Sequence, residues 1–114
     1  MAVLAWQGDL DVSSRELLRA ALNEVPVHGA DAVDAVVIDL SDVSFLDCSA
    51  AGILVAWAHR AGLDGVRVIL AHPVSIVRRL LQALELDRAL VVADTLEQAH
   101  AMAHLTDGRQ LPEG

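Results

Sequence analysis

Short apolar runs alternate with amphipathic stretches along the first part of the chain. Residues 3–6 are apolar and a Gly-Asp pair follows at 8–9, which predicts a short strand that ends before a helix. Leucine, alanine and valine then recur at helical spacing, so we expect a helix that begins at Ser13 and ends before Pro26. Ser13 and Glu16 have the spacing of a capping box, which supports this start.

The middle of the chain repeats the pattern of strand and helix. Residues 35–38 are apolar without alternation, as in a parallel strand that is covered on both faces. Residues 39–47 are expected to connect this strand to a helix at about 49–61. Residues 66–71 are again apolar and predict a third strand.

The last third of the chain predicts two more helices and a short strand. The His-Pro pair at 72–73 is expected to start a helix, because a first turn tolerates proline, and residues 90–92 predict a strand. Thr95 and Gln98 have capping-box spacing and open a helix that we expect to reach residue 105. The alternation predicts an α/β domain with a mostly parallel sheet of roughly four to five strands and about four helices.

Composition agrees with one compact domain. A chain of 114 residues suits a single core, and 54% hydrophobic against 21% charged residues is far from a disordered composition. We expect residues 1–105 to form the domain. Residues 106–114 are expected to form a frayed polar tail.

Charge and cysteine content exclude several classes of function. The net charge of −8 repels phosphate backbones, so direct nucleic-acid binding is not expected. Mean hydropathy is high, at +0.45, but the longest apolar run, residues 50–58, is less than half of the roughly 20 residues that a membrane span needs. Cys48 is the single cysteine, which excludes an internal disulfide, and no basic leader precedes an apolar segment. The expected location is the cytoplasm.

The most informative segment joins the second strand to the second helix. Asp47, Cys48 and Ser49 stand where a parallel strand ends and a helix begins, a place where ligand and phosphate sites collect. The structural alternative is that Asp47 or Cys48 only caps the helix. Residues 50–58 leave no polar face, so the helix is either buried all round or shows an apolar strip to a partner. Complete burial is difficult in a domain of this size, which favours the partner.

Residues 36–52, VVIDLSDVSFLDCSAAG, resemble the signature of the STAS domain, which bacterial anti-sigma factor antagonists share with the tails of sulfate transporters. Residues 8–11 are similar to the family's early GELD element, and residues 81–88 with 95–99 are similar to its C-terminal pattern. The resemblance covers nearly the whole chain. It implies a STAS-like, non-enzymatic antagonist that binds a serine-kinase anti-sigma factor and thereby releases a sigma factor. The partner would hold ATP and magnesium, so no cofactor or metal is expected on this chain.

The resemblance also implies roles for individual residues. Asp47 would orient the start of the helix, Cys48 and Ser49 would lie at the contact, and Ile53 and Trp57 would supply apolar area to the partner. Antagonists of the family usually carry a phosphorylatable serine directly after the signature aspartate. Cys48 occupies that phosphoacceptor position, and Ser49 is the adjacent hydroxyl. A phosphate there suits a helix N-terminus but repels the partner.

Two further departures from the family pattern are visible. The family usually begins with two antiparallel strands, whereas this chain has residues for only one before the first helix, which implies an open sheet edge or a start that is placed too late. Glu85 stands where a glycine would commonly end the third helix.

Other interpretations of the same residues remain open. A constitutive STAS scaffold in a signalling or lipid-transport complex would not need the serine, and a homodimer is compatible with either role. A redox sensor or enzyme could use Cys48, since a helix N-terminus lowers a thiol pKa, but no base is placed beside it. His100 and His104 are four residues apart without a third metal ligand. Asp39 and Asp42, which with Asp47 are similar to an acidic phosphoacceptor pocket, lack the matching lysine and are expected to be turn residues.

Overall fold

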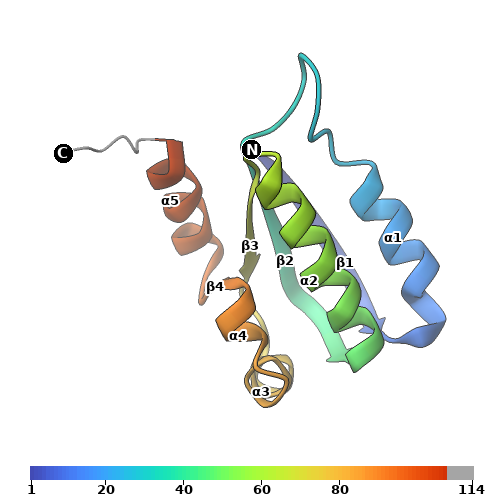
Figure 1. Cartoon of the computed structure of the whole chain (residues 1–114). Coiled ribbons are helices and arrows are strands. Elements are labelled where there is room, and N and C mark those ends of the chain that lie inside the picture. Colours follow the sequence, from blue (N-terminus) through green and yellow to red (C-terminus); the bar gives the residue numbers. More distant parts are fainter. Residues whose placement is uncertain (108–114) are drawn as a thin grey trace.

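The computed structural model describes residues 1–107 and contains a four-stranded sheet in the order β1-β2-β3-β4, in which all neighbouring strands are parallel. The strands are β1 (Ala2–Leu10), β2 (Ala35–Leu46), β3 (Arg67–Ala71) and β4 (Val91–Ala93). The helices are a short 3₁₀ helix (Val12–Ser14), α1 (Arg15–Asn23), α2 (Cys48–Leu63), α3 (Ser75–Ala83), α4 (Leu86–Ala89) and α5 (Leu96–Asp107). Figure 1 shows α1 and α2 side by side over β1 and β2, with α5 apart from them. The predicted α/β architecture with a parallel sheet is confirmed.

Two apolar clusters lie on the two faces of the sheet. Val36 and Ile38 of β2 belong to the larger cluster, into which α1, α2, α3 and α4 insert their leucines and valines. Their neighbour Val37 points the other way and packs against Ala99 and Ala103 of α5. Consecutive residues of a strand face opposite sides, which is why this unbroken apolar run fills both clusters.

The first two strands are longer than their apolar runs predicted. β1 continues through Gly8, which has a φ of +91° that glycine adopts without strain. The pairing of β1 with β2 changes register twice, between Ala5 and Gln7 and between Gly8 and Asp9. The expected connector at 39–47 is wrong for most of its length. It continues β2 as a strand because Leu40 and Val43 are buried in the larger cluster.

The first helix starts by a different device from the one predicted. The Asp11 carboxylate accepts hydrogen bonds from the Ser13 and Ser14 backbone N–H groups at 3.0 and 3.3 Å, and the Asp11 N–H donates to Ser14 Oγ at 2.9 Å. The predicted capping box of Ser13 and Glu16 is therefore wrong. Asp11 and Ser14 form the box and start the 3₁₀ helix that precedes α1.

The C-terminal third departs from expectation in its helix boundaries. His72 has a left-handed φ of +57°, so α3 starts at Ser75 and not at the His-Pro pair. Glu85 is also left-handed, at φ +57°, and the unpredicted α4 follows it. The start of α5 matches the predicted spacing, since Thr95 Oγ1 accepts from the Gln98 N–H at 3.0 Å. Most of the predicted tail at 106–114 lies outside the described residues.

Candidate functional site

Asp47 connects the end of β1 to the start of α2. One carboxylate oxygen, Oδ1, accepts a hydrogen bond from the Ala50 N–H at 2.9 Å, which caps the helix. The other, Oδ2, accepts from the Val12 N–H at 3.1 Å, and the Asp47 N–H donates to the Leu10 carbonyl at 3.0 Å. The capping role weighed for this aspartate is confirmed, and the same side chain also holds the segment after β1 in place.

Cys48 and Ser49 have different surroundings although they are adjacent. Cys48 is the first residue of α2, and its free thiol is exposed. Ser49 is half-buried and lines a groove between α1 and α2. One residue along a helix turns the side chain by roughly 100°, which explains the difference. A partner that approaches the tip of α2 meets the thiol directly.

Exposed apolar side chains gather at the carboxyl-terminal edge of the sheet. Val12 follows β1 and is 62% exposed, Phe45 near the end of β2 is 42% exposed, and Ile76 after β3 is 48% exposed. The carboxyl ends of parallel strands meet at one edge, so these three side chains lie toward the edge of the sheet at which α2 starts. The sequence interpretation missed them because it looked for apolar area on the helix and not at the strand ends.

The large side chains of α2 point inward. Trp57 is only 6% exposed and Leu54 only 2%, whereas Ile53 is half-buried and packs against the larger cluster. The expectation that Trp57 offers exposed apolar area is therefore wrong. It fails because α2 packs against α1 as well as the sheet, so that Gly52 and Ala56 are exposed in the middle of the helix while its large apolar side chains are covered.

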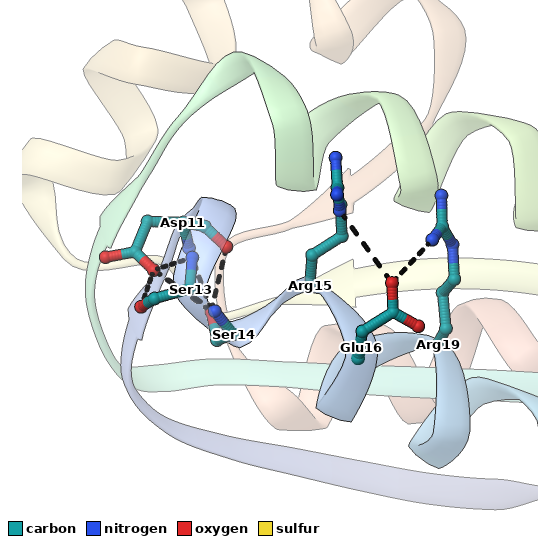
Figure 2. Close-up of polar contacts among 6 residues, drawn as sticks. All are labelled: Asp11, Ser13, Ser14, Arg15, Glu16 and Arg19. Atoms are coloured by element: carbon teal, nitrogen blue, oxygen red, sulfur yellow. Dashed lines mark hydrogen bonds and ion pairs between the residues drawn. The ribbon is translucent and has the colours of Figure 1, made fainter.

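The groove between α1 and α2 has a volume of about 310 Å³ and carries three arginines on its walls. It is lined by Arg15, Arg19, Leu22, Asn23, Ser49, Gly52, Ile53, Ala56, Trp57 and Arg60. Figure 2 shows the side chains of Arg15 and Arg19 extending from α1 toward α2, with Glu16 between them.

In the same view, the Ser13 hydroxyl donates to Asp11 at 2.6 Å and holds the pKa of that carboxyl below its ordinary value.

The remaining candidates form no metal or membrane site in the part of the chain that the structure describes. No group of three metal-ligating side chains occurs there, and the His104 side chain, the second of the predicted pair with His100, lies outside the described residues. Asp39 accepts a hydrogen bond from the Ser41 N–H within β2, at 2.9 Å. No helix within residues 1–107 is long and apolar enough to span a bilayer.

Comparison with known proteins identifies the family. The sequence profile of the STAS domain matches residues 1–99. Anti-sigma-F factor antagonist RsfB from Mycobacterium tuberculosis is 33% identical over 99 residues, which cover 87% of this chain and 78% of that protein.

Two solved structures have the same fold. A sulfate transporter family protein from Wolinella succinogenes matches with a TM-score of 0.78 and 15% identity, over 94% of this chain and 87% of its own. The anti-sigma factor antagonist SpoIIAA in its unphosphorylated form matches with a TM-score of 0.63 and 23% identity, over 90% of this chain and 86% of its own. With the profile match over most of its length, this chain belongs to the STAS domain family.

Proposed function

We propose that this protein is an anti-sigma factor antagonist that acts in the cytoplasm by binding a serine-kinase anti-sigma factor. The observation that carries the proposal is the exposed Cys48 at the tip of α2, within the family signature and beside the exposed Val12. The similarity to RsfB, an antagonist by name, supports the same role.

The arrangement around Asp47 favours binding without large rearrangement. Because Asp47 bonds to both Ala50 and Val12, the tip of α2 and the segment after β1 are already held together before a partner arrives. A preorganised surface loses less conformational freedom on association. Val12, Phe45 and Ile76 then provide exposed apolar area at the edge of the sheet where the thiol lies.

Capture of the partner by purified protein tests this surface. Each kinase-type anti-sigma factor of the source organism is immobilised, and binding is measured by biolayer interferometry. Val12→Asp should abolish capture with little change in the thermal midpoint, because substitutions at exposed sites usually cost within about 0.5 kcal/mol. Leu63→Asp is the matched control, since Leu63 is 76% exposed at the opposite end of α2. Equal capture by both variants would move the interface elsewhere.

Cys48 makes the proposed antagonist insensitive to its kinase. A serine kinase forms a phosphoester on a hydroxyl, and the hydroxyl nearest to Cys48 in sequence, that of Ser49, is half-buried in the groove. Incubation with the kinase and ATP should leave the intact mass unchanged, whereas Cys48→Ser should gain one phosphate. Rapid stoichiometric phosphorylation of Ser49 in the unmodified chain would contradict the insensitivity but not the antagonist role.

Charge at the tip should oppose binding. Cys48→Asp places a carboxylate where the complex excludes water, and an unpaired buried charge costs several kcal/mol. We expect capture to weaken by at least tenfold, with Cys48→Ala as the control that removes the thiol without adding charge. Undiminished capture by the aspartate variant would place Cys48 outside the contact.

A constitutive scaffold is the second candidate, and the cysteine at the phosphoacceptor position favours it. A scaffold subunit would capture none of the kinase-type anti-sigma factors, and its Cys48→Ser variant would gain no phosphate from them. Sedimentation velocity of the purified chain tests the homodimer that either role allows.

A further inference from the structure

Three of the chain's basic residues line one groove in an otherwise acidic protein. The net charge is −8 and the chain has only eight basic residues, yet Arg15, Arg19 and Arg60 all border the space between α1 and α2. A cluster of one sign against a background of the other attracts ligands of opposite charge. The groove therefore favours an anionic group.

The groove follows both helices. Figure 1 shows α1 and α2 running in the same direction, so Arg15 and Ser49 lie near one end and Arg60 near the other. From Ser49 to Arg60 the groove follows three turns of α2, which is about 16 Å at the helical rise per residue. Gly52 and Ala56 line the groove on α2, and their small size leaves room for a polypeptide backbone to approach.

The arginines have more donors than the chain itself satisfies. Glu16 bonds to Arg19 at 3.0 Å and reaches Arg15 Nε only at 4.0 Å, which is too long for a hydrogen bond. Arg15 Nε is shielded from solvent and has no hydrogen-bond partner. Arg60 forms no ion pair with any side chain that the structure describes. A guanidinium carries five N–H donors. Apart from the shielded Arg15 Nε and the Arg19 nitrogen that bonds to Glu16, the guanidinium donors of these arginines make no hydrogen bond within the described residues.

We propose that the groove binds an acidic polypeptide segment of a protein partner, whose carboxylates pair with Arg15, Arg19 and Arg60. A single small anion would occupy one end and leave Arg60 unused, whereas an extended segment with several carboxylates reaches all three arginines. Arginine binds carboxylates through two parallel hydrogen bonds, which also fixes the segment's position. The inference does not rest on the antagonist role, because a scaffold would use the same groove.

Titration of ¹⁵N-labelled protein with hexaglutamate tests the proposal. Six extended residues span about 20 Å, enough to cover the groove. Hexaglutamate should shift amide signals of α1 and α2 in a saturable way, and hexalysine should not. Raising the salt concentration should weaken the binding, because exposed charges are screened. Inorganic phosphate is titrated in parallel and should bind at least tenfold more weakly.

Variants separate the groove from general charge attraction. The double variant Arg19→Gln/Arg60→Gln should weaken hexaglutamate binding by about tenfold, since each exposed pair contributes modestly. Arg79→Gln, on the exposed side of α3, removes one positive charge elsewhere and should change the affinity less than twofold. The proposal would be overturned if the double variant and Arg79→Gln lost the same affinity for hexaglutamate. It would also be overturned if the shifted amide signals lay outside α1 and α2, or if phosphate bound as tightly as hexaglutamate. The amide spectra themselves report whether each variant is folded.

Discussion

Replacement of Asp47 separates the two contacts that its carboxylate makes. Asp47→Asn keeps one oxygen that can accept from Ala50 and cap α2, but its NH₂ group cannot accept from the Val12 N–H. Asp47→Ala removes both contacts. The two variants should therefore differ in stability by the value of the hydrogen bond to Ala50, because both of them lose the bond to Val12.

The expected magnitudes follow from the burial of the two bonds. The half-buried bond to Ala50 acts as a helix cap, and loss of such a cap costs about 1 kcal/mol. The more exposed bond to Val12 contributes about 0.5–1 kcal/mol. Asp47→Asn should lower the free energy of unfolding by about 0.5–1 kcal/mol and Asp47→Ala by about 2 kcal/mol.

Urea unfolding followed by tryptophan fluorescence measures these changes, because Trp57 is buried and reports loss of the core. The slope with urea should stay constant while the midpoint falls. Asp42→Ala is the control, since Asp42 is exposed on β2 and should change stability by less than about 0.5 kcal/mol. Equal losses for the two Asp47 variants would refute the division of the carboxylate between cap and connection.

Three other substitutions test strain, titration and packing. Glu85→Gly should be more stable toward urea than Glu85→Ala by about 0.5–1 kcal/mol, because an L-residue costs roughly 1–2 kcal/mol in the left-handed region. The greater conformational entropy of glycine in the unfolded chain cancels part of that gain. A glycine variant less stable than the alanine variant would exclude backbone strain at this position. The folded-state pKa of Asp11 is lowered, so the carboxylate's contribution is present above its ordinary pKa and is lost as pH falls through the folded value. The urea midpoint of Asp11→Asn should therefore fall less than that of the unmodified chain when the pH is lowered from about 5 to about 2. Identical dependence of the two midpoints on pH would mean that ionised Asp11 does not stabilise the fold. Trp57→Ala should lower the free energy of unfolding by about 3–5 kcal/mol, measured by far-ultraviolet circular dichroism, and a loss below about 1 kcal/mol would mean that the indole is not in the core.

Local patterns predicted most of the strands and helices, although not α4, and long-range pairing decided where the first two strands end. The apolar run at 35–38 identified β2, but its extension to Leu46 depends on β1 lying alongside with Leu10 opposite Leu46. No local window contains that information. The start of α1 was mispredicted for a local reason. Asp11 and Ser13 are both good capping residues, and the choice between them depended on a 3₁₀ turn that Ser14 completes.

The same distinction separates the parts of the site that were visible in the sequence from those that were not. Asp47 is recognisable because a cap acts on a backbone N–H three residues away, within the same segment. Trp57 is covered because α1 packs beside α2 on the same face of the sheet, and the apolar composition of α2 alone, which carries no information on α1, predicted an exposed strip. The arginine groove has the same origin, since Arg15 and Arg60 are far apart in the chain and line one groove only because β1 and β2 are adjacent and parallel. Two right-handed crossovers onto neighbouring strands place α1 and α2 on one face of the sheet, and that topology creates the surface for a partner.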